Sequence, residues 1–372
     1  MIFMKIRNIL LILFVLLIAV QIFLIRWLTT SEVSELFEPV QGQLTPIAYS
    51  DVEYKPIAIT AKDSVTLKGW EIYAKNNDST TPWLIYFHDR GHEVSFYLNE
   101  YLQLRNLGMN ILAVDYRGFG ESGGEISEKG LYLDADAIYY YIRYKKDIPF
   151  NRIIIYGEGI GAAAAVDLGQ NVNAGAIVLV NPFTSAPELL TDWYPYAWPK
   201  IFSNLDMNSL DKIFKINTPK IFVTNQEKSY IPSEQCDQLF KNSKKYRWRL
   251  EAESDNGINQ YSYFNHLVQL LNSNARFTLG SPPYSLADTL LNTINKQGIG
   301  NAIRQYHDII LDTAANYDMS EYQLDYLGDK LYDEDRVREA LEIYSLNLSA
   351  YPNSGNAIKK RLKATNEKDH SK

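Results

Sequence analysis

The stretch IIIYGEGIGAAAAVDLG at residues 153–169 contains an apolar run, three glycines within five positions and an alanine-rich segment. An unbroken run rich in β-branched residues is typical of a buried strand. The glycines permit a tight turn, and the alanines favour a helix that packs closely against the strand. The stretch therefore predicts a strand, a sharp turn at Gly159 and the start of a helix.

Further runs of β-branched and aromatic residues predict strands at 57–60, 65–73, 83–88, 110–116, 176–183, 220–225 and 246–251. From residue 83 onward these runs alternate with helical patterns, which is typical of parallel strands covered on both faces by crossover helices. The first pair is expected to form an antiparallel hairpin. We therefore expect an α/β fold whose mostly parallel sheet has its ligand crevice at the carboxyl ends of the strands.

The composition is that of an ordinary globular protein, with 46% hydrophobic and 22% charged residues in a chain of 372. The net charge is −7, and the sequence has no long basic run that would follow a phosphate backbone. We therefore expect no nucleic-acid partner. The single cysteine, Cys236, excludes an intramolecular disulfide and a multi-cysteine metal site.

Residues 8–28 form an almost unbroken apolar segment that is long enough to cross a membrane as a helix. The segment is longer than a typical cleaved secretory signal, the alternative reading, and no small-residue cleavage site follows it. We therefore predict a transmembrane anchor at 1–30 and a linker at 31–52. Lys5 and Arg7 precede the segment, so the positive-inside bias predicts a single-pass membrane protein with a cytoplasmic N-terminus and the folded part on the outer side.

Beyond about residue 280 the strand patterns stop, and helical pairs follow, so we predict a helical module at 280–366. Small and aromatic residues at Gly328, Ala340 and Tyr344 fall at the offsets of a tetratricopeptide-like repeat, with a fainter copy at Ala302 and Tyr306. Because so few repeats cannot bury a core alone, we expect the module to dock on the rest of the protein. A structural cap is favoured over a groove that binds a protein or peptide partner.

A set of motifs resembles the membrane-anchored α/β-hydrolases of the BEM46 type and their serine-peptidase-like relatives. The motifs are HDRGHE (88–93), DYRGFGESGG (115–124), the opening stretch, NPFTS (181–185) and IPSEQCDQLF (231–240). The resemblance implies an α/β-hydrolase fold for a domain at 53–275, with a structural turn after Asp115 and a cap at 184–218. The aromatic cap residues, which include Trp193, Tyr196 and Trp198, are expected to form the cap's core rather than to bind substrate.

The family chemistry needs a serine on the turn, an acid after a late strand and a histidine before the last helix. The resemblance places these roles at Gly159, Lys228 and Ile258, none of which has the required side chain. Three neighbouring residues are weak substitutes: Glu158, Glu227 and His266. We expect Glu227 to be a surface charge and His266 to be an ordinary helix residue.

The oxyanion loop of the family corresponds here to His88 and Asp89. Asp89 stands where the family usually has glycine, and a carboxylate beside a developing oxyanion is repulsive. His88, Asp89, His92 and Glu93 could alternatively hold a divalent metal ion, but this spacing matches no ligand signature. We therefore predict no metal and no cofactor.

The sequence favours a catalytically inactive hydrolase-fold protein, a pseudoenzyme, that works by binding or scaffolding. Two alternatives stay open. One is a divergent esterase-like or peptidase-like enzyme that uses other residues, and the other is a protein that binds a small apolar ligand or peptide under the cap without turnover. The predicted partners are the membrane, through the N-terminal helix, and an unknown protein or peptide, through the helical repeats.

Overall fold

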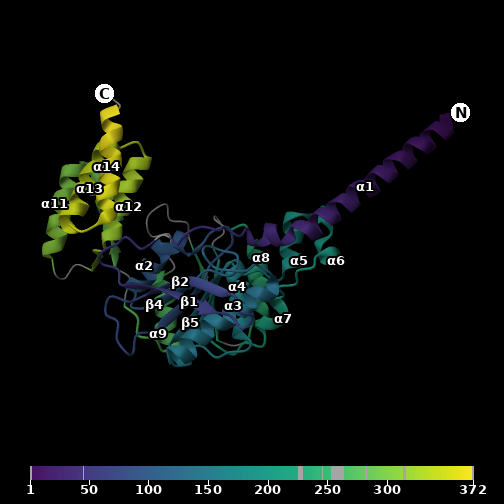
Figure 1. The fold of residues 1–372 in the computed structure, drawn as a ribbon, viewed down its shortest axis with the longest axis horizontal. Coiled ribbons are helices and arrows are strands. Elements are labelled where there is room, and N and C mark those ends of the chain that lie inside the picture. The colour runs from purple at the N-terminus through teal and green to yellow at the C-terminus, as the bar shows by residue number, and fades with distance from the viewer. Residues whose placement is uncertain are drawn as a thin grey trace.

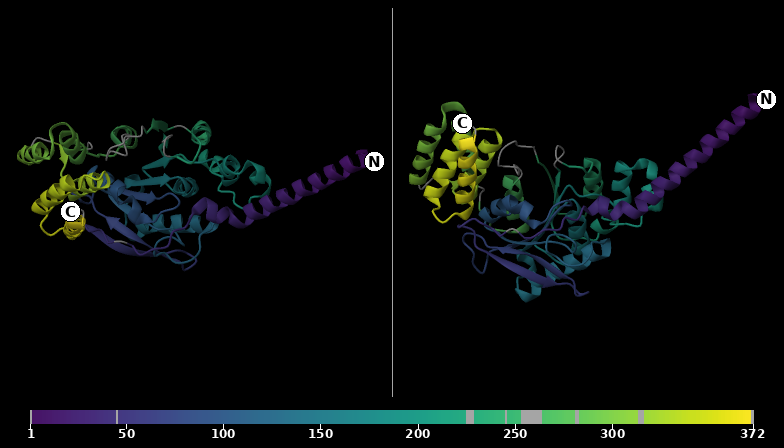
Figure 2. Two further views of the ribbon diagram at one scale, coloured as in Figure 1. Left: turned by 90° about the horizontal axis from the view of Figure 1, so that it is seen from above. Right: turned by 45° about the horizontal axis from the view of Figure 1, so that its top comes forward.

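A computed structural model describes residues 2–44, 46–224, 229–244, 246–252, 264–280, 283–312 and 316–370. A central sheet flanked by helices forms the body of the molecule (Figure 1). The helix α1 (Ile2–Phe37) projects from one side, and a helical module lies on the opposite side, as both views in Figure 2 also show.

The sheet has eight strands in the order β1-β2-β4-β3-β5-β6-β7-β8. The strands β1 and β2 form the predicted antiparallel hairpin, β2 pairs antiparallel with β4, and the remaining neighbours pair in parallel. All eight predicted strands are confirmed. Their bounds are β1 (Tyr54–Thr60), β2 (Thr66–Ile72), β3 (Trp83–Phe87), β4 (Asn110–Val114), β5 (Ile153–Glu158), β6 (Ala176–Val180), β7 (Lys220–Thr224) and β8 (Arg247–Glu251).

Helices cover both faces of the sheet, which explains why its central strands are apolar on both sides. One apolar core joins the sheet to α2 (Leu98–Asn106) and α9 (Phe264–Ala275). The other core joins it to α3 (Glu128–Tyr140), α4 (Ile160–Gly169) and α8 (Ser233–Asn242).

The helix α1 extends past the predicted boundary at residue 30, so the expected linker at 31–52 is wrong for its first part. Ser31, Glu32 and Glu35 interrupt the apolar pattern, but tertiary contacts keep this part helical. The Glu32 carboxylate is almost fully buried and accepts hydrogen bonds from the backbone N–H of Asn204 at 2.9 Å and from the Ser203 hydroxyl at 2.7 Å. The last two turns of α1 are therefore part of the folded domain.

The cap region at 184–218 contains four short helical segments. They are α5 (Ala186–Trp193), the 3₁₀ helix η4 (Pro195–Ala197), α6 (Pro199–Phe202) and α7 (Leu210–Ile213). Of these, η4 and α6 contact α1. Figure 1 shows α5 and α6 beside the base of α1, with α7 below them. Tyr194 packs edge-on against Trp27 of α1, with the ring centroids 4.9 Å apart. The expectation that the cap aromatics are core residues is wrong for Tyr196 and Trp198, which are 79% and 50% exposed.

The C-terminal part is helical, as predicted. It consists of α10 (Leu286–Gln297), α11 (Ile299–Leu311), α12 (Glu321–Asp333), α13 (Val337–Ala350) and α14 (Gly355–His370), and a two-residue strand, β9 (Tyr284–Ser285), pairs with β10 (Tyr317–Asp318) beside them. Gly328 lets α12 approach α13 closely, because a Cβ there would lie 2.3 Å from the Tyr344 ring.

The helical module docks on the hydrolase-like domain through residues that follow α1. The backbone N–H of Ser50 donates to the buried Glu321 carboxylate at 2.8 Å, and the Tyr49 hydroxyl donates to Asp325 at 3.1 Å. Tyr49 also packs edge-on against Tyr322. One continuous apolar core crosses this junction, so the module and the sheet form a single packed body.

We expect Glu32→Ala to loosen the cap from α1. The substitution removes the buried carboxylate that accepts from Ser203 and Asn204, and hydrogen bonds to a charged group contribute about 1.5–3 kcal/mol. Limited proteolysis of the full-length protein should show faster cleavage within 184–218. Ser34→Ala, an exposed position on the same helix, is the matched control. Equal cleavage rates in both variants would contradict this role for Glu32.

Candidate functional site

The turn between β5 and α4 has the backbone shape of a nucleophile elbow, with Gly159 at its apex. Gly159 adopts φ 52° and ψ −114°, a conformation that side-chain-bearing residues rarely reach. The flanking glycines allow the strand and the helix to pack closely. A Cβ on Gly157 would lie 2.3 Å from the carbonyl oxygen of Gly161, and a Cβ on Gly161 would lie 2.1 Å from the carbonyl oxygen of Phe87. The elbow glycines are therefore required by the fold itself.

The Asp89 carboxylate fills the space where a nucleophile side chain would begin. A Cβ built on Gly159 would lie only 1.8 Å from Asp89 Oδ1. The same oxygen accepts hydrogen bonds from the backbone N–H of Ile160 at 3.0 Å, from the backbone N–H of Arg90 at 2.8 Å and from the Tyr230 hydroxyl at 2.6 Å.

In α/β-hydrolases the oxyanion hole is made by the N–H of the residue after the nucleophile and an N–H from the loop after β3. The corresponding groups here are the N–H of Ile160 and that of Arg90, and both point at Asp89 Oδ1. Burial raises the pKa of Asp89, whereas the hydrogen bonds from Tyr230, Arg90 and Ile160 oppose that rise. The two N–H groups at these corresponding positions thus share one carboxylate oxygen of the protein itself.

Arg90 covers this carboxylate from the side of the cap. Its guanidinium packs over the adjacent rings of Trp193 and Tyr230, 4.7 Å and 4.5 Å from their centroids. It also forms an ion pair with Glu38 at 3.1 Å and donates to the Glu35 carbonyl at the end of α1. The cap, the elbow and α1 therefore meet at one cationic side chain.

His88 is fully buried and belongs to the aromatic core beneath the oxyanion loop. Its ring lies 4.3 Å from that of Tyr116, and its Nε2 is 3.5 Å from Asp115 Oδ1. Burial lowers the pKa of His88 to about 4 and raises that of Asp115 to about 8, so both groups are mainly neutral at pH 7. His92 instead stacks on Phe96. Among the described residues, no group of three His, Cys, Asp or Glu side chains is placed to hold a metal ion.

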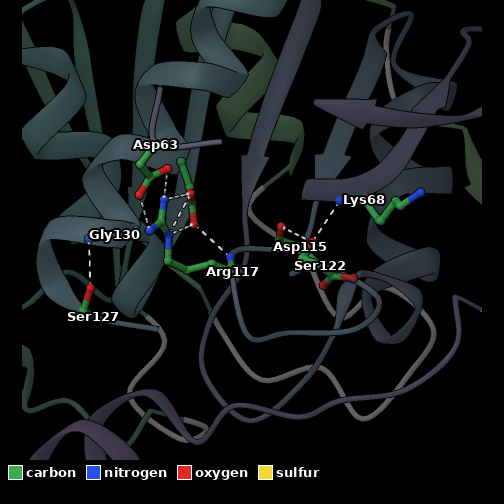
Figure 3. Close-up of polar contacts among 8 residues, drawn as sticks. Asp63, Lys68, Asp115, Arg117, Ser122, Ser127 and Gly130 are labelled. Carbon is green, nitrogen blue, oxygen red and sulfur yellow. Dashed lines mark hydrogen bonds and ion pairs between the residues drawn. The ribbon is translucent and has the colours of Figure 1, made fainter. Parts of the chain in front are cut away.

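Ion pairs and hydrogen bonds of its polar side chains hold the DYRGFGESGG segment in place (Figure 3). Arg117 bridges Asp63 at 2.7 Å and the fully buried Asp134 at 2.8 Å. The Ser122 hydroxyl donates to the Asp115 carbonyl at 2.8 Å and accepts from the backbone N–H of Lys68 at 2.9 Å. These contacts support the structural role that the resemblance implied for this segment.

Of the remaining predicted site residues, the structure describes Glu158, which directly precedes the elbow glycine, and His266. Glu158 accepts a hydrogen bond from the Tyr86 hydroxyl at 3.1 Å, and burial, followed by repulsion from Asp89, raises its pKa to about 8. His266 lies in α9 and is exposed, as expected of an ordinary helix residue. Glu227, Lys228 and Ile258 lie outside the described residues, so their assigned roles stay predictions.

Two contributors to the site were not found from the sequence, namely Arg90 and Tyr230. Arg90 directly follows the unusual Asp89, and Tyr230 precedes the Ile231-Pro232 pair that fixes the register of its loop. Tyr230 is separated from Asp89 by 141 residues, and no local pattern predicts that the two side chains meet. The sequence predicts that Trp193 belongs to the core of the cap, and the packing of its ring on Arg90 is consistent with that role.

Comparisons with known proteins agree with this architecture. The family described as serine aminopeptidase, S33, matches residues 79–245. Protein bem46 of Schizosaccharomyces pombe is 30% identical over 199 residues, which cover 51% of this chain and 66% of that protein, just under two thirds of its length. An uncharacterized membrane protein of Saccharomyces cerevisiae is 26% identical over 218 residues, covering 55% of this chain and 75% of that protein.

A solved structure of similar fold is that of a hypothetical protein from Pseudomonas aeruginosa. It has a TM-score of 0.50 at 15% identity and covers 63% of this chain and 99% of that one. The family match, the relatives and this shared fold establish an α/β-hydrolase fold and homology to protein bem46. The predicted fold class is therefore confirmed for the sheet and its helices.

We expect the stability of the protein to fall between about pH 5 and pH 9, and Glu158→Gln to reduce that fall. The pKa of Glu158 is raised to about 8 in the folded protein, so the folded state binds this proton more tightly than the unfolded state does. The resulting contribution to the free energy of unfolding is complete below the unfolded-state pKa and is lost as pH rises through 8. Denaturant unfolding at several pH values measures the slope. Glu125→Gln, on an exposed turn, is the control, and an unchanged slope in Glu158→Gln would refute the assignment.

We expect Gly159→Ala to lower the free energy of unfolding by about 1–3 kcal/mol, because the new methyl group would overlap the Asp89 carboxylate. In the double variant Asp89→Ala/Gly159→Ala this overlap is absent. The double variant should therefore be less destabilised than the sum of the two single variants. Additive effects in a double-mutant cycle would show that the two residues do not compete for this space.

Proposed function

We propose that the protein is a catalytically inactive hydrolase-fold protein that is held at the membrane and acts through binding or scaffolding. The observation that carries this proposal is the position of Asp89 Oδ1, which lies where the first side-chain atom of a nucleophile would be and accepts from the N–H of Ile160. A substrate carbonyl would have to displace a carboxylate that three donors hold in place.

The sequence at the other two positions supports the same conclusion. A lysine at the acid position would repel a histidinium, and an isoleucine at the base position cannot take a proton from a nucleophile. Because the three replacements affect separate segments of the chain, one altered alignment does not account for all of them. A divergent enzyme that uses Glu158 is less well supported, since that carboxylate is engaged by Tyr86.

Membrane association is supported by the N-terminal helix and by the similarity to a yeast membrane protein. The helix over Asn8–Phe37 is long and apolar enough to cross a membrane, and its most apolar window is not buried in the protein. We retain the proposal that the N-terminus is cytoplasmic and the folded part lies outside. The buried contacts of Glu32 and Leu36 favour an uncleaved helix over a removable signal.

The helical module is the proposed surface for a protein or peptide partner, and its tetratricopeptide-like character is part of this proposal. A cavity between α11 and α13 is lined by Tyr306, Ile310, Leu346 and Tyr351, among others. Ile310 in this lining is 49% exposed, and the adjacent Leu311 is 80% exposed. A small apolar ligand under the cap is less well supported, because Arg90 with Trp193 and Tyr230 occupies that region.

A fluorophosphonate probe tests catalytic inactivity directly. We expect no serine of the detergent-solubilised full-length protein to be labelled and no ester turnover above background. Asp89→Gly/Gly159→Ser, which restores a serine and makes room for it, should stay inactive because the other two triad groups are absent. Labelling of one serine in the unmodified protein, with turnover that is lost when that serine becomes alanine, would overturn the proposal.

A further inference from the structure

A cluster of large apolar side chains on the cap faces solvent. Tyr196 is 79% exposed, Trp198 is 50% exposed and Ile201 is 71% exposed. We call these three residues the cap patch. Trp198 has φ 52° and ψ 54°, a left-handed conformation that is unusual for a bulky residue. A bulky aromatic side chain that is half exposed on a strained turn calls for an explanation beyond folding.

The cap patch lies beside the apolar part of α1. The Gln21 side-chain amide donates to the Tyr196 carbonyl at 2.8 Å. Leu24 and Trp27 pack against a small apolar cluster that joins Leu28 of α1 to Leu190 and Ala197 of the cap. Figure 1 shows α5 and α6 next to the lower part of α1, whereas its N-terminal part extends alone. The cap therefore covers α1 inside the segment that would cross the membrane.

The uncovered apolar part of α1 that follows Arg7 is too short to span a bilayer. Residues 8–20 precede the first cap contact, and 13 residues at about 1.5 Å each give about 20 Å. The hydrocarbon core is about 30 Å thick, so about seven further residues are needed. Within that range, 21–27, Gln21 is bonded to Tyr196 of η4, and Leu24 and Trp27 pack against the cluster that contains Ala197 of η4. If α1 spans the bilayer, this edge of the cap lies at membrane depth.

We propose that the cap patch is inserted into the membrane interface, with lipid as its partner. Tyrosine and tryptophan are enriched at the level of the lipid headgroups, where their apolar rings and polar tips are both accommodated. Ile201 then reaches the edge of the acyl chains. The inference rests on the membrane anchoring proposed above, but it is independent of whether the elbow is catalytically active.

The cap patch lies beside the exposed apolar surface of α1, and this favours lipid over a protein as its partner. Ile22 and Phe23, on the covered part of α1, are still 60% and 67% exposed, so apolar surface runs from α1 toward the cap. Lys200, which precedes Ile201 in α6, pairs with Glu188 at 2.7 Å, and an amphipathic lysine can extend toward headgroups. A membrane would cover the apolar surface of α1 and the cap patch together.

Spin labels on the full-length protein in phosphatidylcholine nanodiscs test the proposal. Ile201→Cys reports on the cap patch, Leu13→Cys on the bilayer centre, and Leu311→Cys on an exposed apolar site in the helical module. All three positions are at least 56% exposed, so substitution removes little packing. The natural Cys236 is 1% exposed, and burial raises the pKa of its thiol to about 12, so it should not react.

Power-saturation measurements then compare collisions of each label with oxygen, which concentrates in lipid, and with a water-soluble nickel chelate. We expect the oxygen-to-nickel ratio at residue 201 to be severalfold higher than at residue 311 and lower than at residue 13. Equal ratios at 201 and 311 would overturn insertion of the cap while leaving the anchor intact. A low ratio at residue 13 as well would overturn the anchoring on which the inference rests.

Discussion

The contact between the Asp89 carboxylate and the N–H of Ile160 organises the centre of this structure. An N–H in the first turn of a helix has no acceptor within the helix and needs one from elsewhere. In a working hydrolase that group serves the transition state. Here the N–H of Ile160 donates to Asp89 Oδ1 at 3.0 Å, and the Tyr230 hydroxyl and the backbone N–H of Arg90 donate to the same oxygen. One carboxylate oxygen of the protein therefore accepts from the N–H groups of both Ile160 and Arg90.

The same contact connects the elbow to the N-terminal helix α1. Tyr230 donates to Asp89, Arg90 stacks on Tyr230, and Arg90 pairs with Glu38 just after α1. The end of α1 is therefore linked through Arg90 to the side chains that surround Asp89. A helix that served only as an anchor would not need a buried carboxylate at its end. Glu32 of α1 is 2% exposed, however, and accepts a hydrogen bond from the backbone of the cap at Asn204.

The sequence was sufficient to predict the sheet, because each buried strand is an apolar run and the hairpin strands are rich in β-branched and aromatic residues. It was also sufficient to place Gly159 on the elbow and to notice that Asp89 departs from the family pattern. It did not predict that α1 continues to Phe37, since its polar residues are held by tertiary contacts. Nor did it predict the meeting of Asp89 with Tyr230, which depends on how two loops far apart in the chain approach each other.

Amide hydrogen exchange at Ile160 tests the central claim most directly. Because the N–H of Ile160 is bonded to Asp89, it should exchange slowly in the unmodified protein and much faster in Asp89→Ala. The N–H of Ala162, which donates to the Gly159 carbonyl at 3.1 Å, should change little and serves as the internal reference. Rapid exchange at Ile160 in the unmodified protein, or no change in Asp89→Ala, would show that Asp89 does not occupy the oxyanion position.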